Sequence, residues 1–492
     1  MARFRPHRMY PGALLAQECC SYQASTELLA QLRGEIVVLV HSDRDCSNVI
    51  SKRRGRVHAE GEYKFLCTNL REDEMVTGQG NARLRAAIEL VHEQLRPKLI
   101  LVLSTCPTVM IGDNIKNVAR KAGRDLGVSV VPMITHGLKP KSPAEVVDDV
   151  YCALTAPSVA AEGDRSRRIN LVGMTLRPDE RAEMTRVFAA MGVEVGVVLD
   201  ERAALDDFLA IGQAGWNVHP GPNMLLAFDK ACAERQGISA IEVPLPFGVA
   251  ASVAFYHRIA AALGVADDVR DAALAAPIAR AEASVARFRA AFADRTLQLA
   301  YNIGSVRSFD LRRIALEELG ELPLFHELGF AARLFIQGSQ DEANWDRVAR
   351  VLGELGVQER FVLFPDPGTL VHFVQPGAFD LWYGARFLRD QLVQVQLPLL
   401  PHHEFGLGLA AVEANIARVE TALRSDFYAR FQAEITTSGS VEQLDAMLGL
   451  GKGVPIPPSQ QPPSDAAPAQ VPVEALSLRK RAKIDLDAEG PP

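Results

Sequence analysis

The chain has 492 residues, of which 48% are hydrophobic and 23% are charged, and its formal net charge is −7. This length exceeds what one hydrophobic core usually organises, so we expect several domains. The acidic balance argues against a nucleic-acid-binding protein, and no apolar run approaches the ~18 residues of a membrane span.

The first 160 residues alternate between short apolar runs and helical patterns. Amphipathic helical patterns occupy residues 81–95 and 109–122. Runs typical of buried strands occupy residues 36–40, 63–66, 99–103 and 128–134. Strand–helix alternation of this kind predicts a parallel sheet with helices on both faces. We therefore predict a first α/β domain over residues 1–160.

Two further α/β domains and a tail follow. We predict a second domain with linker helices over residues 161–295 and a third over residues 296–450, closed by a helix over residues 406–431. Strands are predicted at residues 169–174, 193–200, 295–304, 331–339, 359–366 and 378–385. The fold class is thus α/β, with three doubly wound, Rossmann-like domains. Residues 451–492 are rich in proline and lack periodicity, which predicts a disordered tail.

Cysteines sit where the predicted strands of the first domain end. Cys46 and Cys67 follow the first two strands, and Cys106 follows the third, directly before a helix. The pair Cys19-Cys20 precedes the first helix. Ligands of parallel sheets bind outside the carboxyl ends of the strands, and a helix N-terminus favours the thiolate form that binds metal. These thiols would therefore meet at one edge of one sheet.

Thiols that are spread along the chain but gathered in space fit an iron–sulfur cluster better than a zinc finger, which uses closely paired cysteines. The alternative is a set of buried core residues, since cysteine is among the most buried residue types. We assign Cys152 and Cys232 to the core because both lie within helical patterns. The basic N-terminal residues precede an apolar stretch too short for a signal peptide, so we expect a cytoplasmic protein without structural disulfides.

Three segments together resemble the cluster-binding segments of the nitrogenase component 1 family. They are CSYQAS from residue 20, VHSDRDC ending at residue 46 and STCPTVMIGDNI from residue 104. The segments CTNLREDEMVTGQGNARL and AFDLWYGARFLRDQLVQVQLPLL add to the resemblance, which spans about residues 15 to 430. Carried over residue by residue, the resemblance implies that Cys20, Cys46 and Cys106 are cluster ligands, with Cys19 and Cys67 as additional candidates.

The resemblance also implies a fold of three α/β domains and a set of partners. A homologous second chain would pair with this one as a heterodimer or heterotetramer. An iron–sulfur cluster of the P-cluster type (8Fe-7S) or a 4Fe-4S cluster would lie between the two chains. A separate ATP-dependent iron–sulfur reductase protein would deliver electrons, and a nitrogenase-type iron–sulfur cofactor would accompany a small-molecule substrate. The chain itself contains no GxxxxGK phosphate loop, in keeping with that division of labour.

The second and third domains depart from the family pattern. Where a nitrogenase alpha chain anchors its cofactor by a cysteine of the second domain, this chain has His219-Pro220. The third domain does offer His403, with His402 beside it. A histidine pair that caps the following helix is the alternative for these two residues. His41, near Cys46, is a candidate for a hydrogen bond to a cluster sulfur, or for a simple turn role.

Three functions remain open at this stage. The first is a subunit of a nitrogenase-like reductase complex. We favour methylthio-alkanes as its substrates, with the carbon–sulfur bond reduced, because the nitrogenase cofactor cysteine is missing. The second is an assembly scaffold or non-catalytic partner subunit that holds a cluster. The third is a metal-free small-molecule-binding protein.

Overall fold

Three parallel sheets organise the chain. The computed structural model describes residues 20–30, 32–46, 63–139, 141–200, 202–221, 225–305, 318–402, 404–428 and 430–432. The strand orders are β2-β1-β3-β4, β6-β5-β7-β8 and β11-β10-β9-β12-β13, and every strand pair that they contain is parallel. The three α/β units with parallel sheets predicted from the sequence are confirmed. The predicted tail, residues 451–492, lies outside the described residues.

The first unit has its two most buried strands at its centre. Every residue of β1 and β3 is buried, because helices cover both faces of the sheet. Its elements are α1 (Ser21–Leu29), β1 (Ile36–Val40), β2 (Tyr63–Cys67), α3 (Glu72–Val76), α4 (Gly80–Leu95), β3 (Leu99–Leu103), α5 (Cys106–Met110), α6 (Ile115–Leu126), β4 (Ser129–Met133) and α7 (Pro143–Leu154).

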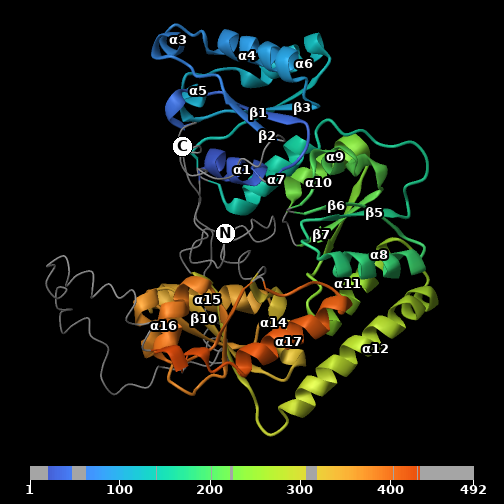
Figure 1. Cartoon of the computed structure of the whole chain (residues 1–492), viewed down its shortest axis with the longest axis vertical. Coiled ribbons are helices and arrows are strands. Elements are labelled where there is room, and N and C mark those ends of the chain that lie inside the picture. The colour runs from blue at the N-terminus through green and yellow to red at the C-terminus, as the bar shows by residue number, and fades with distance from the viewer. Residues whose placement is uncertain are drawn as a thin grey trace, which may run out of the picture.

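The second unit repeats the alternation and ends in two long helices. Its elements are β5 (Arg168–Val172), α8 (Pro178–Ala190), β6 (Glu194–Leu199), α9 (Leu205–Leu209), η1 (Ile211–Gln213), β7 (Trp216–Pro220), α10 (Leu226–Gln236), β8 (Ser239–Val243), α11 (Gly248–Ala262) and α12 (Asp267–Ala291). In Figure 1, α12 runs from the second unit toward the third.

The third unit has the largest sheet. Its elements are β9 (Gln298–Ser305), η2 (Leu319–Glu321), α14 (Leu322–Glu327), β10 (Ala331–Gln337), α15 (Glu342–Glu354), β11 (Arg360–Phe364), η3 (Pro367–His372), β12 (Leu381–Gly384), η4 (Arg386–Leu388), α16 (Arg389–Gln394), β13 (Leu399–Pro401), η5 (Leu409–Ala411) and α17 (Val412–Leu423). Among the described residues, no helix is both long and apolar enough to span a bilayer.

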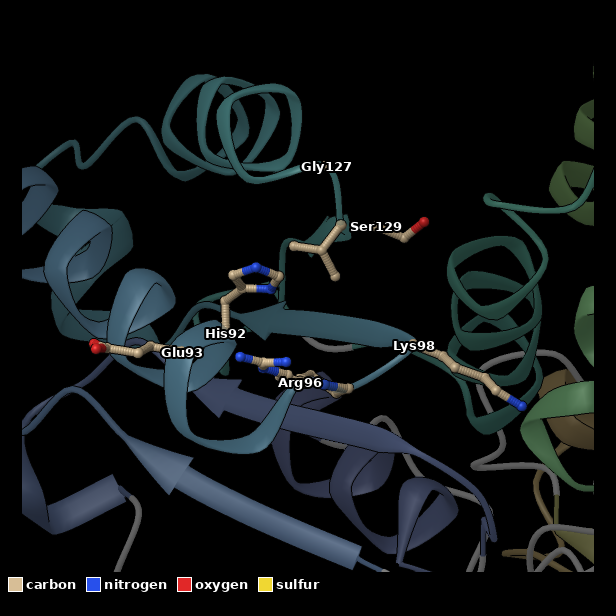
Figure 2. Close-up of a pocket in the computed structure, with 8 residues that line it drawn as sticks. His92, Glu93, Arg96, Lys98, Gly127 and Ser129 are labelled. Carbon is tan, nitrogen blue, oxygen red and sulfur yellow. The ribbon is translucent and has the colours of Figure 1, made fainter.

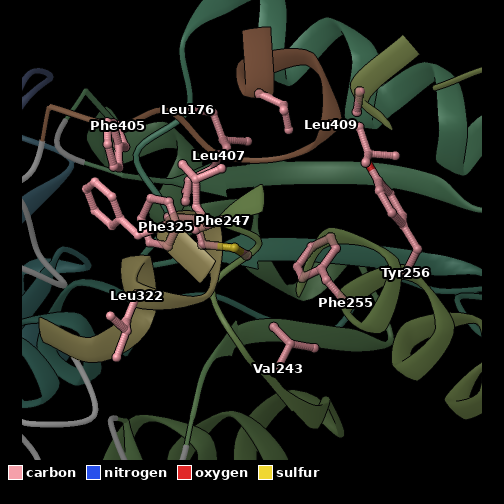
Figure 3. Packing of buried hydrophobic residues seen from close by; sticks show 14 of the residues in the cluster. Leu176, Val243, Phe247, Phe255, Tyr256, Leu322, Phe325, Phe405, Leu407 and Leu409 are labelled. Atoms are coloured by element: carbon pink, nitrogen blue, oxygen red, sulfur yellow. The ribbon is translucent and has the colours of Figure 1, made fainter. Parts of the chain in front are cut away.

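Shared hydrophobic cores join the units. Alternate residues of β1 face opposite sides, so Val37 and Leu39 pack with α4 and α6, whereas Val38 and Val40 join a core that continues into the second unit. The second and third units share another core, in which Leu176 and Phe247 accompany Leu407 and Leu409. Figure 3 shows this packing. The first unit is thus fixed against the second, and the second against the third.

Two predicted helices differ from the observed ones. The pattern over residues 109–122 is not one helix, because Gly112 has a φ of 77° and separates α5 from α6. Asn114 then caps α6 by accepting a hydrogen bond from the N–H of Asn117. The helix predicted over residues 406–431 is shorter, since α17 spans only Val412–Leu423. Apolar periodicity continues through both breaks, so periodicity alone did not reveal them.

Candidate functional site

The carboxyl edge of the first sheet carries two cysteines at the point where the strand order reverses. From β1 the chain passes to β2 on one side, and it returns to β3 on the other side of β1. Cys46 follows β1, and Cys106 follows β3 as the first residue of α5. Open parallel sheets bind ligands in the crevice outside such a switch point. The fold therefore brings these two thiols to the position where ligands of such sheets bind.

Cys20 joins these two thiols from the N-terminus of α1. A β-carbon built on Gly137 would lie 3.4 Å from the Cys20 Sγ and 3.6 Å from the Cys106 Sγ, so both sulfurs border one small space. Burial, together with the negative charges of Asp43, Cys106 and Cys20, raises the pKa of Cys46 to about 11. All three cysteines are partly buried and free of disulfides. Positive charge among them would relieve this repulsion and favour the thiolates.

Buried hydroxyl groups fix the two loops that carry Cys46 and Cys106. The Thr105 hydroxyl bonds to Ser42 Oγ at 2.9 Å and donates to the His41 carbonyl at 3.2 Å. Asp43 Oδ1 accepts a hydrogen bond from the main-chain N–H of Cys46 at 3.2 Å. Ser42 and Thr105 are fully buried, and unpaired polar groups at this depth would be costly. The network therefore holds the ends of β1 and β3 in one relative position.

A fourth segment, which follows β4, closes the site. The main-chain N–H of Gly137 donates to the Cys106 Sγ at 3.1 Å. The Ser21 hydroxyl donates to the His136 carbonyl at 2.9 Å and accepts from the His136 N–H at 2.9 Å. These contacts tie the residue after Cys20 to the loop that touches Cys106. Sequence reasoning missed this segment because it contains no cysteine, although its place after a fourth parallel strand was a usable signal.

The three thiols do not form a site for one metal ion. Among the residues that the structure describes, no group of three or more His, Cys, Asp or Glu side chains is placed to hold a single ion. The thiols come from α1, from the residues after β1 and from α5; those of Cys20 and Cys106 border one space, and Cys46 lies near enough for their charges to act on it. This arrangement suits a larger group with several metal atoms better than a zinc ion in a closed tetrahedral site.

Comparison with known proteins identifies the family of the chain. The family model of the nitrogenase component 1 type oxidoreductases matches residues 20–402, which is most of the chain. The chain belongs to the nitrogenase component 1 family. The matched region begins at Cys20 and ends at His402, so it includes all three sheets and the thiol edge.

Similar proteins within the family have different roles. The nitrogenase molybdenum-iron protein alpha chain of Methanosarcina barkeri is 29% identical over 27% of this chain and 26% of its own length. The nitrogenase iron-molybdenum cofactor biosynthesis protein NifE of Nostoc sp. is 26% identical over 52% of this chain and 53% of its own. One polypeptide of the light-independent protochlorophyllide reductase of a Bradyrhizobium species is 27% identical over 37% of each chain. This chain thus spans about half the length, or less, of these relatives.

Solved structures share the fold. A structure of nitrogenase Cp1 at pH 5 aligns with a TM-score of 0.58 at 17% identity and covers 86% of this chain and 91% of its own. A second structure, at pH 6.5, aligns with a TM-score of 0.57 at 16% identity, over 89% and 93% of the two chains. At this identity the likeness concerns the architecture alone.

Cys67 lies beside the three thiols of this nitrogenase component 1 chain. It is the last residue of β2, and its thiol approaches the carbonyl oxygens of Ser42 at 3.5 Å and Asp43 at 3.4 Å. The main-chain N–H of Asn69 donates to its sulfur at 3.3 Å. The Cys67 sulfur is therefore engaged by the backbone of the loop that leads to Cys46. Cys19 lies outside the described residues.

The His41 side chain forms its hydrogen bonds with groups other than a cysteine sulfur. Its buried ring bonds through Nδ1 to Thr68 Oγ1 at 3.1 Å and through Nε2 to Asp113 Oδ2 at 2.9 Å. Burial lowers the pKa of His41, while the hydrogen bond and charge of Asp113 oppose that effect. Both ring nitrogens are occupied, so His41 acts on the thiol edge through its carbonyl, which accepts from Thr105 and Thr108.

His219 is fixed within the second unit. It is fully buried in β7, with Nδ1 on the Pro220 carbonyl at 3.0 Å and Nε2 on Asp229 Oδ2 at 2.8 Å. Burial alone would lower the pKa of His219, but the hydrogen bond and charge of Asp229 outweigh it and raise that pKa. Both ring nitrogens of His219 are therefore engaged by oxygen atoms of the second unit itself. Cys232 is buried in α10.

The third unit holds one of its two candidate histidines in its interior. His402 is buried after β13, and its Nδ1 lies 2.5 Å from Glu318 Oε2. The rings of Tyr301 and Tyr383 pack against it at 6.1 Å and 4.9 Å between centroids. The His402 ring is therefore packed in the interior of the third unit beside the Glu318 carboxylate. His403 itself lies outside the described residues.

A cavity at the opposite edge of the first sheet is separate from the thiols. It has a volume of about 620 Å³ and is bordered by His92, Arg96, Lys98 and Ser129 (Figure 2). Ser129 begins β4, so the cavity lies at the amino ends of the strands. Helices α4 and α6 also end at this cavity, and the negative ends of their dipoles favour the cationic side chains that border it. We assign these side chains to helix termination.

Proposed function

We propose that this chain is a subunit of a nitrogenase-like reductase complex and that Cys20, Cys46 and Cys106 hold an iron–sulfur cluster at the carboxyl edge of the first sheet. The observation that carries the proposal is the gathering of three free thiols: the Cys20 and Cys106 sulfurs border Gly137, and Cys46 lies near enough for the charges of both to act on it. Ligands from a homologous second chain would complete the cluster, either as a P-cluster-type 8Fe-7S group or as a 4Fe-4S group.

The donor set of the site fits such a group. Iron–sulfur clusters are bound by thiolates, and their potentials are tuned by hydrogen bonds to sulfur and by exposure to water. The site offers three thiols, an N–H group aimed at the Cys106 sulfur, and partial burial. When bound, the cluster would supply reversible uptake and release of electrons. The protein residues position the sulfurs, donate a hydrogen bond and limit the access of water.

The partners follow from the proposed role. An ATP-dependent iron–sulfur protein would deliver electrons to the complex, and the substrate would bind between the units of this chain. We favour the carbon–sulfur bond of methylthio-alkanes as the bond reduced, because no cysteine of the second unit replaces the cofactor ligand expected there. The His219 ring is hydrogen-bonded to Asp229, and Cys232 is buried within α10. His403 would then be the remaining cofactor ligand of this chain.

An assembly scaffold is the second candidate function. It is favoured by the similarity to cofactor biosynthesis proteins of the NifE type, which extends over 52% of this chain in the Nostoc relative. The hydrogen bonds that already engage the His219 ring also support a scaffold, since a scaffold binds its metallocluster less permanently than an enzyme does. A scaffold would use the same three thiols and would release a cofactor to another protein.

The test begins with anaerobic purification of the chain together with the partner that it binds. Iron and sulfide analysis with electron paramagnetic resonance of the reduced complex should show a cluster. A colourless, iron-free complex from cells that assemble clusters normally would contradict the proposal. Reduction of a methylthio-alkane that depends on the ATP-hydrolysing partner would favour the reductase. Transfer of bound iron to an apo-enzyme, without any such turnover, would favour the scaffold.

A further inference from the structure

A second cavity lies in the third unit, bordered by α16, β13, α17 and the residues that follow α17. Its volume is about 660 Å³, within the range of pockets that bind small molecules. β13 is the edge strand of its sheet, and α17 packs along it. This position is distinct from the thiol edge, which is built entirely from the first unit.

Small residues on one face of α17 create the cavity. Ala414, Ala417, Thr421 and Ala422 lie on that face, since positions three and four apart along a helix are neighbours. Leu399 and Leu400 of β13 and the ring of Phe427 supply further apolar wall. The Thr421 hydroxyl is already bonded to the Ala417 carbonyl at 2.7 Å. Ser425 and Tyr428 also line the cavity, and the Ser425 hydroxyl accepts a hydrogen bond from the Phe427 N–H at 3.3 Å. The walls therefore offer mainly apolar contact.

Two arginines give the cavity its charge. Arg418 donates to the Ala414 carbonyl at 3.1 Å and, among the residues that the structure describes, forms no ion pair. Burial lowers the pKa of Arg418, and the nearby charge of Arg177 adds to that effect. Arg389, largely exposed, lies 3.6 Å from its neighbour Asp390, its one ion-pair partner in the described part of the chain.

The negative groups near the cavity have partners of their own. Glu404 also borders it, but its carboxylate is paired with Arg386. Arg177 lies 3.6 Å from Glu180 and donates to the Glu404 carbonyl oxygen. Counted over the lining residues alone, Arg389 and Arg418 against Glu404, the cavity carries a single excess positive charge. That excess matches a monoanion.

We propose that this cavity binds a small organic carboxylate with an apolar chain, whose carboxylate pairs with Arg418 and whose chain lies between α17 and β13. Guanidinium groups bind carboxylates through two parallel hydrogen bonds, and burial of the chain against alanine and leucine adds hydrophobic stabilisation. The site would be independent of the cluster and of any second chain bound at the thiol edge.

Isothermal titration calorimetry of the purified full-length protein tests this proposal with three probes. Octanoate carries both the charge and the chain, 1-octanol only the chain, and acetate only the charge. We expect saturable binding of octanoate and binding about tenfold or more weaker for the other two. Absence of saturable octanoate binding, or equal binding of 1-octanol or acetate, would overturn the proposal.

Three variants locate the site. Arg418→Gln removes the charge and Ala417→Phe fills the space, and each should weaken octanoate binding about tenfold or more. Arg350→Gln, on the exposed face of α15, is the matched control and should leave binding unchanged. Because Arg418→Gln could disturb folding, Ala417→Phe at an exposed alanine provides an independent reading. Unchanged octanoate binding by Ala417→Phe would contradict a small-molecule site. A change in the oligomeric mass of that variant, without weaker octanoate binding, would also contradict it.

Discussion

The main-chain N–H of Gly137 donates a hydrogen bond to the Sγ of Cys106 over 3.1 Å. The same residue faces the Cys20 Sγ, because a β-carbon added to it would lie 3.4 Å from that atom. Gly137 thus borders two thiols that come from different helix N-termini, those of α1 and α5. Its lack of a side chain leaves room there, and its N–H supplies a fixed dipole to one of the sulfurs.

Replacement of Gly137 by alanine should lower metal binding without unfolding the protein. The added β-carbon meets both sulfurs at ordinary van der Waals distances, 3.4 Å and 3.6 Å, so the change is not a steric clash. It nevertheless occupies space that a cluster would need. We expect the iron content of the Gly137→Ala complex to fall at least about twofold, with little change in the midpoint of thermal unfolding.

Gly353→Ala is the control for that substitution. Gly353 lies in α15, and a β-carbon there would meet no atom within 4 Å. Alanine in a helix is more stable than glycine by about 0.5–1 kcal/mol, so this variant should be neutral or slightly stabilised. Equal iron content in Gly137→Ala and Gly353→Ala would argue against the role assigned to Gly137.

The Cys46 thiol should react slowly in the metal-free protein. Its pKa is raised to about 11, so little thiolate exists at pH 8, whereas an ordinary cysteine with a pKa of about 8.5 is substantially ionised there. Alkylation of Cys46 by iodoacetamide, followed by mass spectrometry, should accelerate steadily up to about pH 11. Asp43→Asn keeps an oxygen acceptor but removes one negative charge, so it should lower the pKa and raise the rate at pH 8. A rate at pH 8 that is unaffected by Asp43→Asn would contradict this account.

The buried pair His219–Asp229 should stabilise the second unit most at low pH. The pKa of His219 is raised in the folded protein, so the stabilisation is complete below the unfolded pKa of about 6.5 and is lost as the pH rises through the folded pKa. Asp229→Asn should therefore cost about 3 kcal/mol or more near pH 6 and progressively less in alkaline solution. Thermal unfolding of both proteins across this pH range measures the difference.

The exposed pair of His257 and Asp271, at 4.0 Å, provides the comparison for that pH series. Exposed ion pairs contribute little because water and salt screen them. Asp271→Asn should accordingly show almost no pH-dependent effect. If Asp229→Asn followed the same flat profile, the assignment of the raised pKa of His219 to Asp229 would be wrong.

Thr105→Val should loosen the connection between the two loops that carry Cys46 and Cys106. Valine is similar in shape but cannot bond to Ser42 Oγ or to the His41 carbonyl. The His41 carbonyl keeps its bond from Thr108, whereas the buried Ser42 hydroxyl loses a partner. We expect a loss of about 1–3 kcal/mol in stability, measured by denaturant unfolding. A variant as stable as the parent would show that this network does not hold the site.

The gathering of the thiols was predictable from the sequence because one rule governs it. The apolar runs that precede Cys46 and Cys106 predict parallel strands, and the carboxyl ends of such strands meet at one edge. The structure confirms the three α/β units and brings Cys20, Cys46 and Cys106 together. Their identity as cluster ligands stays a prediction.

Other features of the site depend on contacts that local patterns do not encode. The direction of the His41 ring is set by Asp113, which is distant in sequence and carries no motif that pairs it with a histidine. The orientation of the His219 ring likewise depends on a hydrogen bond to Asp229 in the next helix. Gly137 was missed because its contribution is an N–H group and an absence of side chain, and every residue type except proline has such an N–H.

The most direct measurement of the central claim compares four cysteine variants of the anaerobically purified complex. Serine replaces Cys20, Cys46 and Cys106 in turn, and Cys152→Ser, on α7, is the control for loss of a partly buried thiol. We predict that each of the first three substitutions removes most of the iron and acid-labile sulfide, while Cys152→Ser retains the parent's content. Full iron and sulfide in any of the first three variants would contradict a cluster held jointly by these thiols.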